Sequence, residues 1–248
     1  MKRLLSVLLC MLAFAAPAFA NSYINGIDAN YPPFAYIDEK SGKPAGFDVE
    51  SLDWIAKHMG FEVKHTPVAW EGIIPALLAK KIDMVCSGMS ISPERTRLVA
   101  FSEPYWKAHN VFVVKQNSDL TVASILTEKL KVGGQRGSSE AVALAKMQRE
   151  QHLRFEMRLY DSGFQMLDDV ANGRIHAALI DSQPAQDAVS SGKPVKIAGI
   201  YGAPIRFGVA FRHEDAALRA LVNEGYGKLM ADPFWRHLQQ KYGVQPLD

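Results

Sequence analysis

The sequence predicts an α/β fold, because short apolar runs alternate with stretches of helical periodicity along most of its 248 residues. Runs such as 23–27 and 111–114 are typical of strands, whereas the apolar positions in 47–59 recur at the spacing of a helix. Strands that alternate with helices indicate largely parallel sheets covered by helices. The sequence has no repeat with a period of about 20–50 residues, so a repeat architecture is not expected.

Five elements are expected in the N-terminal half of the chain. The strand at 23–27 is followed by the helix at 47–59, which Gly60 ends. A helix at 73–78 tolerates Pro75, because a proline in the first turn costs no helical hydrogen bond. Two further strands are expected at 84–87 and 111–114.

The C-terminal half continues the alternation. Ser138, Ser139 and Glu140 open a helix, and Ser138 is placed to cap its N-terminus. Polar stretches at 117–119 and 190–194 are typical of surface turns. The remaining helices are expected at 162–171, 218–230 and 234–242, and the remaining strands at 175–180 and 207–211.

Residues 1–20 have the layout of a secretory signal peptide. Lys2 and Arg3 precede an almost wholly apolar run at 4–14, and a small-x-small cleavage site follows at 18–20. The apolar run has 11 residues, which is too short for a helix to cross a bilayer. A large residue precedes Cys10, which argues against a lipoprotein signal. We therefore expect export and cleavage after residue 20.

Composition excludes several classes of protein. The net charge of +2 falls to zero when Lys2 and Arg3 leave with the signal, so the mature chain has no electrostatic footprint for nucleic acid or anionic lipid. No later stretch approaches 18 consecutive apolar residues, and we expect a soluble mature protein. The mature chain is long enough for one large or two small domains, each with its own core.

The two cysteines, Cys10 and Cys86, do not predict a disulfide. Cys10 leaves with the signal, so Cys86 has no partner within the chain. Cys86 ends an apolar run, where a buried thiol that packs as a small apolar group is expected rather than a nucleophile.

Motifs of catalysis and metal binding are missing from the sequence. There is no Gly-x-Ser-x-Gly elbow and no Walker-type phosphate loop, and Ser190 to Lys193 matches Ser-x-x-Lys only within a turn. None of the seven histidines has the spacing of a zinc site: His58, His65, His109, His152, His176, His213 and His237. We expect no catalytic residue, no metal and no cofactor.

Several polar or aromatic segments fall instead at strand-to-helix junctions. Ligands of α/β sheets bind outside the carboxyl ends of the strands, so these segments are candidates for a binding site. They lie at 28–34, 46–48, 70–75, 87–95, 101–105, 137–140 and 173–181.

Taken in order and spacing, these segments resemble the polar-amino-acid family of bacterial solute-binding proteins, which includes the histidine, lysine/arginine/ornithine and glutamine receptors. The resemblance covers 28–242, and its strongest motifs are Ser-Pro-Glu-Arg, which ends at Arg95, and Phe-Ser-Glu-Pro-Tyr at 101–105. It implies a two-lobed periplasmic binding protein fold of type II, with two strand crossovers at a hinge near His109 and Ile205.

The resemblance also implies lobe limits. Lobe 1 would consist of residues 21–108 together with 206–248, and lobe 2 of residues 109–205. In the family, a ligand binds between the lobes, which then close over it.

The charged groups of the implied site suit a free amino acid, whose carboxylate and ammonium must both be satisfied on burial. Arg95 occupies the family's carboxylate-binding position, and a guanidinium matches a carboxylate with two parallel hydrogen bonds. Asp181 occupies the ammonium-binding position, although it is also placed to cap a following helix. Ser138 and Ser139 lie at a helix start that adds partial positive charge. Segment 87–90, which is Ser87, Gly88, Met89 and Ser90, matches a segment that holds both ligand charges.

Selectivity is implied by three further positions. Tyr31 and Trp70 match residues that sandwich the ligand side chain, and two aromatic faces favour a cationic or planar group. Asp28 matches an acid that faces the distal amine in the basic-amino-acid receptors. A packing role for Trp70 and an Asx turn at Asp28 are the alternatives. Glu140 either contacts the ligand or complements the helix dipole, and Gly88 replaces a serine of the basic-amino-acid receptors.

The resemblance implies a periplasmic receptor and not an enzyme. The receptor would bind a polar or basic amino acid and deliver it to the permease of an ABC transporter. It is expected to be a monomer. One alternative is an enzyme on the same scaffold, similar to periplasmic cyclohexadienyl dehydratases, with Glu140 as its acid. Another is a diffusible ligand sensor.

Overall fold

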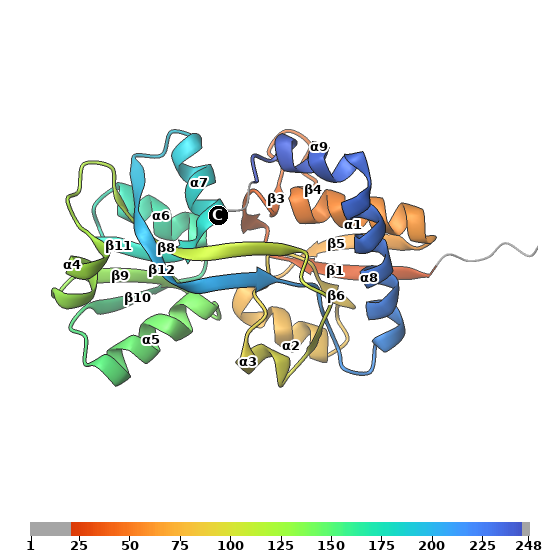
Figure 1. The fold of residues 1–248 in the computed structure, drawn as a ribbon, viewed down its shortest axis with the longest axis horizontal. Helices are drawn as coiled ribbons and strands as arrows, with labels where there is room; N and C mark the ends of the chain where they lie inside the picture. The colour runs from red at the N-terminus through yellow and green to blue at the C-terminus, as the bar shows by residue number, and fades with distance from the viewer. Residues whose placement is uncertain (1–20, 245–248) are drawn as a thin grey trace, which may run out of the picture.

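The computed structural model describes residues 21–244, which form two lobes that lie side by side (Figure 1). The signal peptide expected at 1–20 lies outside the described residues. Each lobe is built around one five-stranded sheet with helices packed on it. The expected two-lobed α/β fold is therefore confirmed.

The sheet of the first lobe has the strand order β5-β1-β6-β13-β7. Strand β1 pairs in parallel with both β5 and β6, whereas β13 is antiparallel to its neighbours β6 and β7. The bounds are β1 Ser22–Ile27, β5 Glu62–Pro67, β6 Met84–Val85, β7 Ala100–Phe101 and β13 Ala210–Phe211. A small antiparallel sheet lies beside it, made of β2 Asn30–Tyr31, β3 Ala35–Ile37 and β4 Pro44–Ala45.

The sheet of the second lobe has the strand order β10-β9-β11-β8-β12. Strands β10, β9 and β11 are parallel, and β8 and β12 are antiparallel additions. The bounds are β8 Trp106–Lys115, β9 Lys131–Gln135, β10 Glu156–Tyr160, β11 Ala177–Asp181 and β12 Val195–Phe207.

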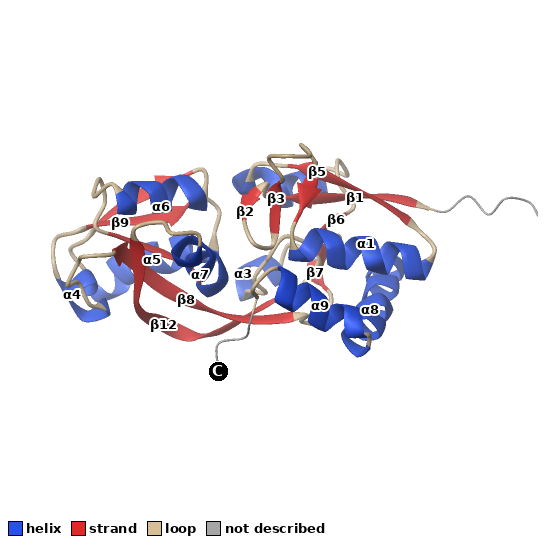
Figure 2. Cartoon of the chain, turned by 90° about the horizontal axis from the view of Figure 1, so that it is seen from above, coloured by secondary structure: helices blue, strands red, loops and turns tan. Residues whose placement is uncertain are grey.

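Strands β8 and β12 run together from one lobe to the other (Figures 1 and 2). They pair from Val195 with Lys115 at one end to Phe207 with Trp106 at the other, and the register shifts between Tyr201 and Ile205. The irregular stretch lies next to the expected crossings. The lobe limits of 21–108 with 206–248, and of 109–205, stay a prediction.

Helices cover the sheets, and most were expected within two or three residues. Gly60 ends α1 in the left-handed conformation, and Ser138 caps α5 through a hydrogen bond from Ala141 N–H to Ser138 Oγ (3.0 Å). The bounds are α1 Phe47–Met59, α2 Ile73–Leu78, α3 Pro93–Thr96, α4 Val122–Thr127, α5 Ser139–Gln151, α6 Gly163–Ala171, α7 Ser182–Ser190, α8 Ala216–Ala231 and α9 Pro233–Lys241, with a 3₁₀ turn at Trp70–Gly72. Among the described residues, no helix has the length and apolar content needed to cross a membrane.

The single strand expected at 207–211 is wrong. Phe207 ends β12, and the chain then changes sheets before Ala210 and Phe211 form β13. Gly208 lies at the break, where its N–H donates to Met89 O (3.0 Å) and Ile91 packs against its Cα. Two short apolar pieces that belong to different sheets were therefore joined in the sequence prediction.

Each lobe has its own apolar clusters in its core. In the first lobe, Leu52 and Ile55 of α1 pack against Val222 and Leu229 of α8. In the second lobe, clusters lie on both faces of the sheet and include Val113 and Leu179. Cys86 is fully buried, as expected, and burial raises the pKa of its thiol.

Candidate functional site

The predicted site residues gather where the two lobes meet. Asp28 follows β1, and segment 87–90 follows β6 in the first lobe. Asp181 ends β11, and Ser138 and Ser139 begin α5 in the second lobe. The carboxyl ends of parallel strands from both sheets thus face one another.

Arg95 is buried, with 7% of its surface exposed, and is not a surface arginine. Its Nη1 donates to Ser90 O (3.0 Å) and Ser90 Oγ (2.7 Å), and its Nη2 donates across the interface to Gly137 O (3.2 Å). The short helix α3 holds Arg95, and Ser92 caps that helix. Burial lowers the pKa of Arg95, and the charges of Glu140 and Asp181 oppose that effect.

Asp181 accepts a hydrogen bond from the Tyr31 hydroxyl, which belongs to the first lobe. Asp181 stands at the N-cap position of α7, but its side chain makes no capping hydrogen bond there. Burial raises the pKa of Asp181 well above its usual value, and the charge of Glu140 raises it further. The Asp181 carboxylate therefore lies in the interface between the lobes and does not cap α7.

Asp28 is buried and makes contacts in both lobes. Its Oδ1 accepts from Asn30 N–H (3.0 Å), so the Asx turn exists, and its own N–H donates to Ser87 Oγ (3.0 Å). Its Oδ2 accepts from Gln135 Nε2 in the second lobe (2.7 Å). Burial raises the pKa of Asp28, and the bond from Gln135 opposes that rise. The Asx turn and an interlobe role coexist.

Segment 87–90 contributes through its backbone and its serines. Gly88 has φ of +60°, and its N–H donates to the buried carboxylate of Asp48 (2.6 Å). A Cβ on Gly88 would stand 2.4 Å from the Tyr31 ring, so glycine lets that ring lie close. Met89 directs its side chain into the apolar core instead of the interface.

The start of α5 supplies polar atoms to the interface. Ser138 caps the helix, so the capping alternative is confirmed for that residue. Ser139 Oγ lies 2.8 Å from Ser90 Oγ of the first lobe and donates to Glu140 Oε1 (3.2 Å). Glu140 is only 6% exposed. A residue that only compensates the dipole of a surface helix does not need to be buried so deeply.

Trp70 is half-buried and serves two neighbours. Its ring lies 5.3 Å from the guanidinium carbon of Arg95, and its other contacts are with the apolar cluster that contains Ile73 and Leu77. Trp70 therefore packs in the apolar cluster, as the alternative expected, and also lies beside Arg95.

Two residues of the interface lie outside the segments that the sequence singled out: Asn110 and Gln135. Gln135 ends β9, a strand missed because its Gly133-Gly134 pair is unusual in a strand. Those glycines admit close packing, since a Cβ on Gly133 would stand 2.8 Å from Met166 Cγ. Recognition of β9 would have placed Gln135 at a strand end.

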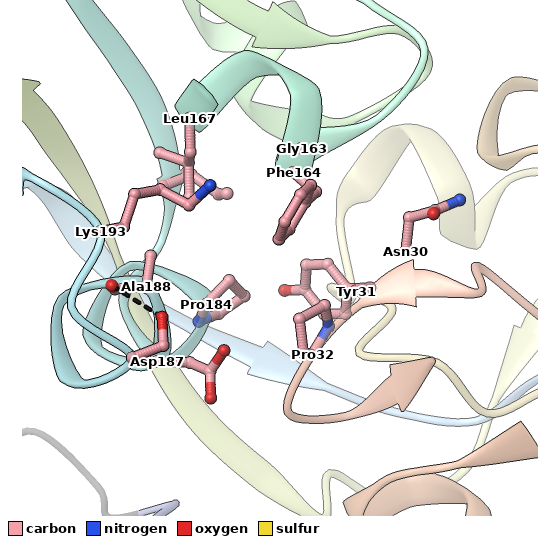
Figure 3. Close-up of a pocket in the computed structure, with 12 residues that line it drawn as sticks. Asn30, Tyr31, Pro32, Gly163, Phe164, Leu167, Pro184, Asp187, Ala188 and Lys193 are labelled. Carbon is pink, nitrogen blue, oxygen red and sulfur yellow. Dashed lines mark hydrogen bonds between the residues drawn. The ribbon is translucent and has the colours of Figure 1, made fainter. Parts of the chain in front are cut away.

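A small pocket with a cavity volume of about 30 Å³ lies between the lobes and shares Tyr31 with the site. Figure 3 shows Tyr31 and Pro32 facing Phe164 of α6 and Pro184 of α7 across it. Its lining is mainly apolar and includes two charged residues, Asp187 and Lys193, of which Lys193 is paired with Asp168.

Within residues 21–244, no group of three or more histidine, cysteine, aspartate or glutamate side chains is arranged to hold a metal ion. The arrangement that remains is a buried guanidinium, three buried carboxylates and aromatic rings between two lobes. Such an arrangement suits a small charged molecule, because it offers buried groups of both signs.

Known proteins were compared with the chain. An L-arginine-binding protein of Pseudomonas aeruginosa is 30% identical over 88% of this chain and 86% of its own. The L-cystine-binding protein of Escherichia coli is 29% identical over 88% of this chain and 80% of its own. A solved ancestral arginine-binding protein bound to arginine matches 91% of this chain and 100% of its own, with 30% identity and a TM-score of 0.83.

The model of one protein family, the bacterial extracellular solute-binding proteins, family 3, matches residues 23–245. That match spans both lobes and every residue of the interface described above. The chain therefore belongs to the bacterial extracellular solute-binding proteins of family 3, and it is a binding protein rather than an enzyme.

Proposed function

We propose that this protein is the extracytoplasmic receptor of an ABC transporter and binds a free polar or basic L-amino acid between its lobes. The observation that carries the proposal is the convergence of buried Arg95 and buried Asp181 in one interface. A zwitterion needs one cation and one anion from the protein, both withdrawn from water.

The ligand carboxylate would take the guanidinium of Arg95 together with the helix start at Ser138 and Ser139. Arg95 now donates to protein oxygens of Ser90 and Gly137, and a carboxylate is a stronger acceptor than either. The ligand ammonium would take Asp181, whose present donor, Tyr31, is neutral.

The side chain of the ligand would lie between Tyr31 and Trp70 and extend towards Asp28. Charge favours a basic ligand, because the site buries Asp28, Glu140 and Asp181 against the single cation Arg95. A ligand with net positive charge reduces that imbalance. Segment 87–90, with Ser87, Gly88, Met89 and Ser90, would form the floor. The relatives whose names specify arginine support the same choice.

Delivery requires further partners. The periplasm is the expected compartment, and a membrane permease would receive the closed form of the receptor. The receptor would act as a monomer, with lobe limits near residues 108 and 206. Sedimentation of the secreted chain tests the oligomeric state, and isolation of periplasmic extract tests the compartment.

A thermal-shift screen of the refolded chain 21–248 against the common amino acids tests the function. Refolding removes any ligand carried through purification. Millimolar ligand over a micromolar site stabilises the native state by roughly 4 kcal/mol. A shift selective for arginine, lysine, ornithine or histidine is expected. A shift with another amino acid would keep the receptor and reject the basic preference, and no shift with any amino acid would reject the proposal, with prephenate and arogenate as the next compounds.

A further inference from the structure

Two buried carboxylates stand together at the end of the second sheet. Asn110 of β8 is the residue directly opposite Asp181 of β11. In the amide orientation that its surroundings require, Asn110 Nδ2 donates to Glu140 Oε1 (2.9 Å) and to Asp181 Oδ1 (3.3 Å). One amide thus joins both acids, and each of them is less than 8% exposed.

Within residues 21–244, neither acid forms an ion pair with a lysine, arginine or histidine. Asp181 accepts from the Tyr31 hydroxyl, and Glu140 accepts from the Ser139 hydroxyl. The cation that faces them is Arg95 of α3, and its side-chain hydrogen bonds go to Ser90 and Gly137. Two like charges held so close in a buried place do not both stay ionised, because each raises the cost of ionising the other.

The pair is a property of one lobe. Glu140 belongs to α5, Asp181 to β11 and Asn110 to β8, all of the second lobe. Tyr31 and Arg95 come from the first lobe and would leave when the lobes part. Opening would therefore remove the neutral hydroxyl of Tyr31 and the cation Arg95 but leave the two acids and their amide together.

We propose that Glu140 is the second acid of the ammonium subsite, and that the Glu140–Asp181 pair holds one proton which ligand binding expels to solvent. The inference rests on the proposed function of Asp181 as the ammonium-binding group. One carboxyl O–H bond breaks, its proton passes to the buffer, and the ligand ammonium keeps its three hydrogens. No redox change occurs and no other bond forms or breaks.

The exchange makes affinity depend on pH. While the pair is protonated, binding releases one proton. Each unit of rising pH lowers the activity of the competing proton tenfold, so affinity increases by up to about tenfold per unit. Above the pH at which the pair loses its proton, affinity levels off. A site with a single acid in its ordinary range would show no such dependence near neutral pH.

The shared proton is tested in the ligand-free protein, by following side-chain carboxyl ¹³C shifts against pH. D181N and E140Q assign the two resonances. We expect Asp181 to titrate well above its usual range in the parent, and its midpoint to fall in E140Q, because the charge of Glu140 helps to raise it. D187N is the matched control, because Asp187 is a partly buried acid outside the cluster. Ordinary acidic midpoints in the parent, or no change in E140Q, would overturn the proposal.

Proton release is tested by calorimetry of L-arginine binding near pH 6 in phosphate and in Tris, whose ionisation heats differ. Close to one proton released by the parent and clearly fewer by E140Q is the expected result, with D187N like the parent. Binding without proton release overturns the proposal. A raised Asp181 midpoint that falls in E140Q, without any arginine binding, supports the shared proton and counts against arginine as ligand, so the two failures are distinguishable.

Discussion

At the scale of single residues, Arg95 and Gly137 form one of the contacts that join the two lobes. Arg95 Nη2 donates to the carbonyl of Gly137 from the opposite lobe. Gly137 in turn stands against the backbone of Glu71, and its φ is +71°. Arg95 contributes a charged donor, whereas Gly137 contributes a carbonyl and has no side chain that would collide with Glu71.

Arg95→Ala is expected to weaken amino-acid binding by about 3–5 kcal/mol, because it leaves the ligand carboxylate buried without its partner. Calorimetric titration with the ligand found in the thermal-shift screen measures the loss. Arg97→Ala is the matched control, since Arg97 follows the same short helix and is exposed. Similar affinities for the two variants would remove Arg95 from the site.

Gly137→Ala is expected to hinder closure, because the new Cβ would stand 2.9 Å from Glu71 Cα across the interface. Ligand affinity should fall by more than backbone strain accounts for. Gly192→Ala is the control, with a similar positive φ of +85° and nothing within 4 Å of the added Cβ. Small-angle scattering of both variants with saturating ligand checks the result, and a compact Gly137→Ala particle would contradict it.

At the scale of elements, the N-terminus of α1 supports the segment that carries Ser87 and Ser90. Asp48 is fully buried in that helix and accepts from Gly88 N–H (2.6 Å) and from the Tyr105 hydroxyl (2.7 Å). Its other oxygen, Oδ1, is buried without a hydrogen-bond partner. Burial raises the pKa of Asp48 to about 7, and the two donated hydrogen bonds oppose the rise.

The raised pKa gives a stability prediction with a definite sign. Ionised Asp48 is disfavoured in the folded state, so its contribution is most favourable below the unfolded pKa near 4 and declines as pH rises to about 7. The change amounts to about 4 kcal/mol across that window. Asp48→Asn does not titrate, so its stability relative to the parent should improve steadily between pH 4 and pH 7.

Urea denaturation at several pH values measures this difference. Asp119→Asn serves as the control, because Asp119 is exposed and its replacement should leave the parent's pH dependence unchanged. Parallel curves for Asp48→Asn and the parent would show that Asp48 has an ordinary pKa.

The elements also show which sequence patterns are sufficient to predict a helix or a strand. Helix α1 was predicted from its apolar spacing and Gly60, because both signals are local. Strand β12 was missed: it is half-exposed over most of its length and irregular between Ile197 and Gly199 and between Tyr201 and Ile205. Hydrogen bonding to β8 stabilises β12 as a strand, although the sequence pattern of β12 does not predict one.

At the scale of the whole molecule, the site residues hold the lobes together by contacting one another. Tyr31 bonds to Asp181, and Gln135 bonds to Asp28. Each bond joins one lobe to the other, and each uses a group that the proposed ligand would also need. Closure and ligand recognition therefore draw on the same atoms.

Gln135→Leu is expected to shift the ligand-free protein towards open forms, because it leaves buried Asp28 without its interlobe donor. Small-angle scattering of the ligand-free variant should give a larger radius of gyration than the parent. Gln116→Leu is a control at an exposed position outside the interface. Equal radii for parent and Gln135→Leu would show that this bond does not hold the lobes.

The sequence by itself determined the α/β class and most helices, because periodicity and capping residues are local along the chain. Its resemblance to the solute-binding family singled out Arg95, Asp28 and Asp181, whose role in binding stays a prediction. Only the tertiary structure decided that Gln135 and Asn110 stand beside those acids and that Met89 turns into the core. It also decided that 207–211 divides between two sheets. These facts depend on which distant segments pack together, and packing is set by contacts that no local pattern encodes.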